Sequence, residues 1–140
     1  MGFPIETARG VIRQDQCDMM GHFTTREYAP FFSQGVWGIL KALGYDPDVM
    51  VAQGYGFADV QYLTKFYREL HAGDEIFVMS TVKKLGNSSL TSQHLLYNAA
   101  TKAVCAEFEA VSVQFDLRAR AKIPLLDVVR SRAAEAGVPA

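Results

Sequence analysis

The chain has 140 residues, of which 49% are hydrophobic and 21% are charged, and its formal net charge is −1. This length allows one domain with its own core, and the near-neutral charge gives no reason to expect nucleic acid or an anionic membrane as a partner. No apolar run approaches the ~20 residues of a membrane span, and Cys17 and Cys105 have neither metal-binding nor disulfide-framework spacing. We therefore expect a single domain over residues 1–140 in a reducing cytoplasm, without a metal site.

The first predicted strand, over about residues 6–14, leads into a short loop that carries Asp18. Thr24 and Glu27 follow at the spacing of a capping box, which predicts that a helix begins directly after the loop. Asp18 would then lie a few residues before unpaired amides at the positive end of the helix dipole. A carboxylate that can attack or take a proton, beside amides that can hold an oxyanion, is suited to catalysis.

The one long helical pattern runs over about residues 25–43. Phe23, before the helix, is placed to clamp Tyr28 as a hydrophobic staple, and Gly44 is a natural stop. Trp37 lies off the apolar stripe, so either a surface outside the domain's own core covers it or it lies partly exposed. The stripe itself has spacings of three and four residues and consists of Tyr28, Phe31, Phe32, Gly35, Ile39, Leu40 and Leu43.

Beyond Gly56 the hydrophobic period changes from helical to two, which predicts four more strands. Val60, Tyr62, Thr64 and Phe66 share one face of the first of these. Their expected ranges are about residues 57–67, 76–82, 90–97 and 103–115, with Lys83 and Lys84 in the turn after the second.

The last of these strands changes phase, because Val104 and Phe108 share one face whereas Val111 and Phe115 continue on the other. This change predicts a β-bulge near Glu109. A short terminal helix is expected to begin at Pro124.

These elements predict an α+β fold in which a long central helix is wrapped by a curved antiparallel sheet of five main strands. Exposed sheet edges would remain, and dimerisation by edge pairing is the simplest way to cover them.

The segment Asp18-Met-Met-Gly21-His22-Phe23-Thr24-Thr25-Arg-Glu-Tyr28 resembles the D-x-x-G-H-x-N-N-x-x-Y pattern of hotdog-fold acyl-CoA thioesterases. It is most similar to the branch typified by 4-hydroxybenzoyl-CoA thioesterase, with a Thr pair in place of the commoner Asn pair. The later Leu70-x-x-Gly73-Asp74 resembles that family's strand ending in a Gly-Asp turn.

The resemblance implies roles for several residues. Asp18 would be the catalytic nucleophile or base, and the backbone amide of Thr25 would bind the thioester carbonyl oxygen. Lys83 and Lys84 would meet the nucleotide phosphates of CoA. Family members are homodimers or homotetramers whose active sites lie between two subunits, so the same assembly is expected here.

Four further side chains are candidates for contact with the substrate. Tyr28 belongs to the motif, and Asp59 and Gln61 are placed to line the pocket from a partner subunit. His22 is either a second acid/base group or a buried histidine bonded to the backbone. His71 and His94 are expected to be structural.

The leading functional hypothesis is hydrolysis of an acyl- or aroyl-CoA thioester, with no cofactor beyond the CoA of the substrate. Two alternatives stay open: a hotdog-fold hydratase or dehydratase of acyl thioesters, and a non-catalytic acyl-CoA-binding protein. The usual hydratase motif has four residues between its acid and its histidine and includes an Asn-Pro. Asp18 and His22 have three intervening residues and no proline. Cys17 has no evident His–acid arrangement to activate it as a nucleophile.

Overall fold

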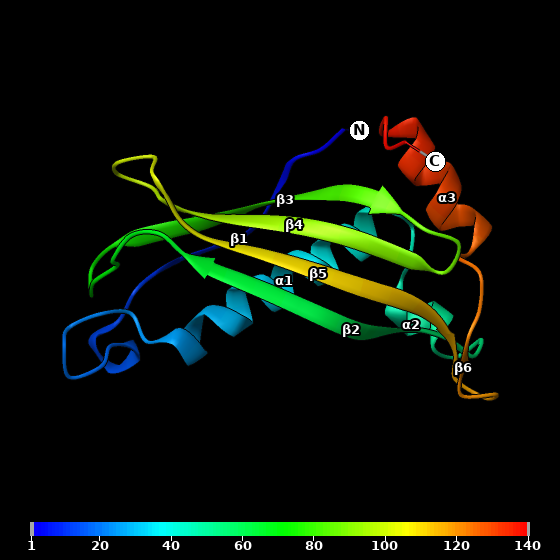
Figure 1. Cartoon of the computed structure of the whole chain (residues 1–140), viewed down its shortest axis with the longest axis horizontal. Helices are drawn as coiled ribbons and strands as arrows, with labels where there is room; N and C mark the ends of the chain where they lie inside the picture. Colours follow the sequence, from blue (N-terminus) through cyan, green and yellow to red (C-terminus); the bar gives the residue numbers. More distant parts are fainter. Residues whose placement is uncertain (1, 140) are drawn as a thin grey trace.

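A curved antiparallel sheet wraps around one long helix in the computed structural model of the chain, which describes residues 2–139 (Figure 1). The order of the strands is β1-β3-β4-β5-β2, and the short β6 pairs with the end of β5. This confirms the predicted helix and sheet of five main strands. The strands are β1 (Ile5–Val11), β2 (Tyr55–Phe66), β3 (Glu75–Leu85), β4 (Ser89–Asn98), β5 (Val104–Asp116) and β6 (Ala121–Lys122).

The long helix, α1 (Tyr28–Ala42), is preceded by a 3₁₀ turn, η2 (Thr25–Glu27). The predicted capping box is wrong, because the Thr24 side chain makes no capping hydrogen bond. Instead the amide of Glu27 donates to the backbone carbonyl of Thr24 at 2.9 Å, which is the tighter bonding of a 3₁₀ turn. The remaining helices are η1 (Gln14–Gln16), α2 (Pro47–Met50) and α3 (Asp127–Glu135). None of the helices within residues 2–139 has the length and apolar character needed to cross a membrane.

The helix buries one face against the sheet, as its stripe predicts. The staple is confirmed, since the rings of Phe23 and Tyr28 lie 4.6 Å apart. Trp37 points away from the stripe and is 44% exposed. Phe32, Val36, Ile39 and Leu40 are all at least nine-tenths buried.

A close approach between α1 and the sheet occurs at Gly35. A Cβ atom there would overlap with Nδ1 of His94 and would lie 3.0 Å from Oγ of Ser80. Because glycine has no Cβ, the helix backbone can rest directly on β3 and β4. The helix therefore packs mainly on β1, β3 and β4.

His94 is the buried polar group under this contact, with 0% exposure. Its Nδ1 is hydrogen-bonded to the Ser80 hydroxyl at 2.6 Å and its Nε2 to the Ser92 hydroxyl at 2.8 Å. Both ring nitrogens are therefore satisfied in the neutral form, and burial lowers the pKa of His94 to about 4.

The bulge predicted near Glu109 is wrong. The inner face of β5 keeps one parity through Phe108, Ala110, Ser112 and Gln114, all of which are buried. Gln114 can point inward because its Nε2 donates to the backbone carbonyl of Gly56 at 2.7 Å. The apolar residues that suggested a change of phase, Val111 and Val113, lie on the outer face and are half-buried.

Two boundaries also differ from the prediction. Strand β3 continues to Leu85, so Lys83 and Lys84 lie in the strand and not in a turn. The terminal helix begins at Asp127, because Leu125 first enters the core in an extended segment whose amide donates to the Asn87 carbonyl at 2.9 Å. Pro124 therefore precedes the helix and does not open it.

The burial of neutral His94 predicts a pH dependence of stability. Its pKa is about 4 in the folded chain against an ordinary histidine value of 6.5, so the unfolded chain binds more protons between these values. The contribution of neutral His94 to the free energy of unfolding is therefore fully present above about pH 6.5. It should fall by about 3 kcal/mol as the pH drops to about 4.

The measurement is the free energy of unfolding in urea between pH 4 and pH 7, for wild type and for His94→Gln. Acidic groups titrate alike in both proteins, so the difference between the two curves isolates His94. Parallel curves would contradict the prediction. An NMR titration of the His94 ring gives an independent test, and a pKa above 6 would contradict burial of the neutral form.

Candidate active site

A tight loop places the carboxylate of Asp18. Oδ1 accepts hydrogen bonds from the backbone amides of Met20 at 2.9 Å and His22 at 3.1 Å, and the Asp18 amide donates to the His22 carbonyl at 2.9 Å. Gly21 has φ +81°, a left-handed conformation that side chains disfavour. Within residues 2–139, no hydrogen bond is made to Oδ2 of Asp18, so this oxygen can act on a bound molecule.

The loop is fastened to the connection between β2 and β3. The amide of Phe23 donates to the carbonyl of Leu70 at 2.8 Å, and both side chains are buried, at 4% and 1% exposure. The amide of Thr24 donates to the carbonyl of Gln16 at 2.9 Å. These bonds hold the Asp18 loop beside the start of η2.

The amide of Thr25 lies at this helical start. This amide donates no hydrogen bond to an acceptor in the described part of the chain, as expected for the first amides of a helical segment. A free amide of this kind can donate to an oxyanion.

Two cavities meet at this point. An open one of about 420 Å³ is lined by polar groups that include Asp18, His22 and Glu69. A more enclosed one of about 290 Å³ lies between α1 and β2. Thr25, Tyr28 and Phe66 line both cavities, so the residue that carries the free amide lies where the two cavities meet.

Half of the residues that line the enclosed cavity are aromatic. Tyr28 meets Phe66 edge to face at 5.0 Å, and Phe32 stacks on Phe108 at 4.7 Å. Burial raises the pKa of Tyr28 to about 12, so its phenol is neutral at physiological pH. Trp37, Phe57 and Tyr62 complete the aromatic lining, of which only Tyr28 was predicted as a site residue.

Asp59 brings a carboxylate into the aromatic cavity. It accepts hydrogen bonds from the Tyr62 hydroxyl at 2.6 Å and the Ser112 hydroxyl at 2.8 Å. The bond to Asp59 raises the pKa of Tyr62 to about 12.

A register shift at Val60 explains this placement. Asp59 pairs with Ser112, whereas Gln61 pairs with the adjacent residue of β5, Val111. Val60 is therefore an extra residue in β2. The bulge puts Asp59 on the same face as Tyr62, and Gln61 is exposed and lines neither cavity. Asp59 therefore lines the cavity of its own chain, whereas Gln61 does not line it.

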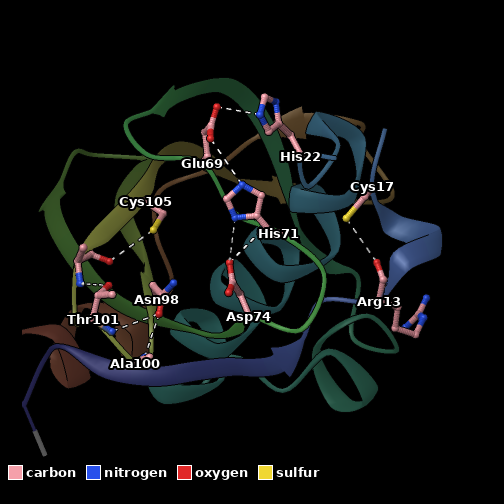
Figure 2. Close-up of polar contacts among 11 residues, drawn as sticks. Arg13, Cys17, His22, Glu69, His71, Asp74, Asn98, Ala100, Thr101 and Cys105 are labelled. Carbon is pink, nitrogen blue, oxygen red and sulfur yellow. Dashed lines mark hydrogen bonds and ion pairs between the residues drawn. The ribbon is translucent and has the colours of Figure 1, made fainter. Parts of the chain in front are cut away.

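His22 differs from the expected buried histidine. It is only partly buried, and its Nε2 lies 2.8 Å from Oε1 of Glu69 instead of bonding to the backbone. His71 lies on the other side of the same carboxylate, with its Nε2 3.5 Å from Oε2 (Figure 2). Cys17 points away from this group toward the Arg13 carbonyl, at 3.6 Å. Glu69 carried no signal in the sequence, since it becomes a neighbour of His22 only through the Phe23–Leu70 hydrogen bond.

Lys83 and Lys84 lie near the end of β3 beside α3, at the opposite end of the sheet from the Asp18 loop (Figure 1). Lys83 forms an ion pair with Glu109 at 2.8 Å, which raises its pKa, and Lys84 is exposed. One chain by itself therefore does not bring these lysines to Asp18.

Comparisons with known proteins identify the family and the fold of the chain. Residues 12–133 match the model of the thioesterase-like superfamily. A search of curated proteins found no significant match.

Solved structures share the fold. A 1,4-dihydroxy-2-naphthoyl-CoA thioesterase from Synechocystis is 15% identical, with a TM-score of 0.80 over 94% of this chain and 97% of that one. A hypothetical protein from Staphylococcus aureus in complex with CoA is 14% identical, with a TM-score of 0.86 over 100% and 90%. A gentisyl-coenzyme A thioesterase is 20% identical, with a TM-score of 0.75 over 90% and 98%.

The fold is thus the hotdog fold of these thioesterases. The chain belongs to the thioesterase-like superfamily, and the reaction class that follows from this membership is thioester hydrolysis.

Proposed function

We propose that the protein hydrolyses an aroyl- or acyl-CoA thioester at the junction of the two cavities. The observation that carries the proposal is that Thr25, whose amide has no acceptor among the described residues, lines both the cavity of Asp18 and the aromatic cavity. A thioester carbonyl bound there would have a donor for its oxygen, a carboxylate nearby and an apolar space for its acyl group.

The enclosed cavity favours an aromatic acyl group. Its walls are rings that can stack on or meet another ring edge to face. Its volume of about 290 Å³ is at the small end of ordinary ligand pockets. Two structural neighbours are named for aroyl substrates, 1,4-dihydroxy-2-naphthoyl-CoA and gentisyl-CoA, which supports the same class here. The neighbour in complex with CoA supports a CoA ester as the substrate.

The proposed chemistry uses Oδ2 of Asp18, while Oδ1 stays bonded to the loop amides. Either Oδ2 takes a proton from water as the water oxygen attacks the carbonyl carbon, or Oδ2 attacks that carbon itself and water hydrolyses the resulting anhydride. In both routes the carbonyl oxygen becomes an oxyanion bonded to the Thr25 amide. Collapse breaks the carbon–sulfur bond, and the CoA thiolate leaves and is protonated.

We also propose that the working form is a homodimer, or a tetramer built from it, joined through β2. This strand has a neighbour in the sheet, β5, on one side only. Large apolar side chains on and after it are exposed, including Val60 at 61% and Leu63 at 46%. An unpaired edge with such side chains favours pairing with a second copy. In such an assembly, Lys83 and Lys84 could reach CoA phosphates only at a site other than their own chain's.

Replacement of Asp18 tests the chemistry. Asp18→Asn keeps an Oδ1 for the amides of Met20 and His22, so the loop should survive, but the charge needed to attack or to take a proton is lost. We expect kcat for thiol release from the best substrate in an aroyl- and acyl-CoA panel to fall by about 10²–10⁴ with little change in KM. Asp15→Asn is the matched control, because Asp15 is exposed and, among residues 2–139, pairs only with Arg13, at 3.0 Å.

Retention of more than about a tenth of wild-type turnover would exclude Asp18 from the reaction. Circular dichroism provides the folding control. Loss of enoyl-CoA absorbance without thiol release would identify the hydratase, and binding without either reaction would identify the non-catalytic alternative.

Charge on the β2 edge tests the assembly. Val60→Lys/Leu63→Lys places like charges on both copies at the proposed contact, so the protein should become monomeric by light scattering. Val49→Lys/Val51→Lys is the control, with similar exposure of 48% and 51% near α2. A wild type that is monomeric at working concentration, or a β2 variant that assembles as wild type does, would contradict pairing through β2.

A further inference from the structure

We infer that His22, Glu69 and His71 form a binding site for one divalent transition-metal ion, of which Zn²⁺ is the natural probe. Each offers one ligand atom, and the three atoms lie within 4.8 Å of one another. Glu69 is central, with its oxygens 2.8 Å from Nε2 of His22 and 3.5 Å from Nε2 of His71. Neighbouring ligand atoms in a tetrahedral zinc site stand about 3.3 Å apart, as bond lengths near ~2.0 Å require. Small rotations of these side chains would suffice to bind an ion.

The backbone holds the three ligands in place. Phe23 and Leu70 are buried and joined by a backbone hydrogen bond of 2.8 Å. His22 precedes Phe23, and Glu69 and His71 flank Leu70. Because Leu70 points into the core, its two neighbours point outward on the side where His22 lies (Figure 2). The arrangement of the three ligands therefore depends on the buried Phe23–Leu70 contact and not only on the conformations of their own side chains.

A second carboxylate, that of Asp74, lies beside the ring of His71. Oδ2 of Asp74 accepts a hydrogen bond from the backbone amide of His71 at 2.8 Å. The same oxygen lies 3.7 Å from Nδ1 of the His71 ring (Figure 2). A ligating histidine commonly faces a carboxylate through its other ring nitrogen, which fixes the ring and strengthens it as a ligand. Asp74 can act in this way while Nε2 faces Glu69.

The donor set selects the class of ion. Two imidazoles and one carboxylate suit zinc and similar transition metals, whereas Mg²⁺ and Ca²⁺ prefer sites built from oxygen alone. All three side chains are accessible, with exposed fractions of 35% for His22, 65% for Glu69 and 55% for His71. Solvent can therefore deliver the ion and supply a further ligand.

A bound ion would connect two segments that are far apart in the sequence. His22 closes the loop of Asp18, and Glu69 and His71 belong to the connection between β2 and β3. Since His22 and Glu69 also line the cavity of Asp18, the ion would stiffen the loop that holds this carboxylate.

The test is isothermal titration calorimetry of ZnCl₂ into protein that carries no affinity tag and has been freed of metal with a chelator. We expect one ion per chain with a micromolar or lower dissociation constant. His71→Ala and Glu69→Gln should each weaken binding at least about tenfold. Zn²⁺ should raise the unfolding temperature of wild type but not of His71→Ala, because only the former binds the ion in its folded state.

Two control variants separate this site from other zinc ligands nearby. Cys17→Ser removes the closest thiol of the loop, and Asp15→Asn removes an exposed carboxylate; both should bind Zn²⁺ as wild type does. The proposal would be overturned by absence of saturable binding below millimolar Zn²⁺, by unchanged binding in His71→Ala, or by loss of binding in Cys17→Ser. None of these measurements uses a thioester, so their outcome is independent of the proposed enzymatic activity.

Discussion

The close contact of α1 with the sheet at Gly35 determines where the helix lies relative to the strands. The helix backbone lies against His94 and Ser80, where a Cβ atom would not fit. Because α1 is drawn toward β1, β3 and β4, space remains between the helix and β2. The aromatic cavity is therefore a consequence of helix packing, and the strand that bounds it, β2, is an edge strand of the sheet.

The second constraint is the Phe23–Leu70 hydrogen bond, which joins the Asp18 loop to the β2–β3 connection. It brings the loop carboxylate, the Thr25 amide and the mouth of the aromatic cavity together. It also determines that His22 meets Glu69 and His71. The proposed reaction and the proposed metal site thus share one structural support but use different side chains.

Local patterns in the sequence were sufficient to predict the helix and the sheet. The apolar stripe of α1 and the period-two runs after Gly56 reflect contacts that each segment makes along its whole length. The error in β5 arose where polar residues behave as core: Ser112 and Gln114 point inward because Asp59 and Gly56 satisfy their hydrogen bonds. A reading of apolar residues alone assigned the wrong face to that part of β5.

Other features depended on long-range pairing that no local pattern contains. The bulge at Val60 is visible only when β2 is aligned with β5, and it decides that Asp59 and not Gln61 reaches the cavity. Likewise, Glu69 and His71 are remote from His22 in sequence, so no local spacing indicated that the three would meet. The entry into α1 through a 3₁₀ turn reflects backbone bonding that the Thr24 and Glu27 side chains do not reveal.

The central claim is that one amide serves both cavities, and a crystal structure of the inactive Asp18→Asn protein with an aroyl-CoA bound would test it most directly. We expect the thioester carbonyl oxygen within hydrogen-bonding distance of the Thr25 amide, the aromatic ring among Phe32, Phe66 and Phe108, and the side chain of residue 18 beside the carbonyl carbon. An acyl group outside the α1–β2 cavity, or a carbonyl oxygen bonded elsewhere, would contradict the proposed site.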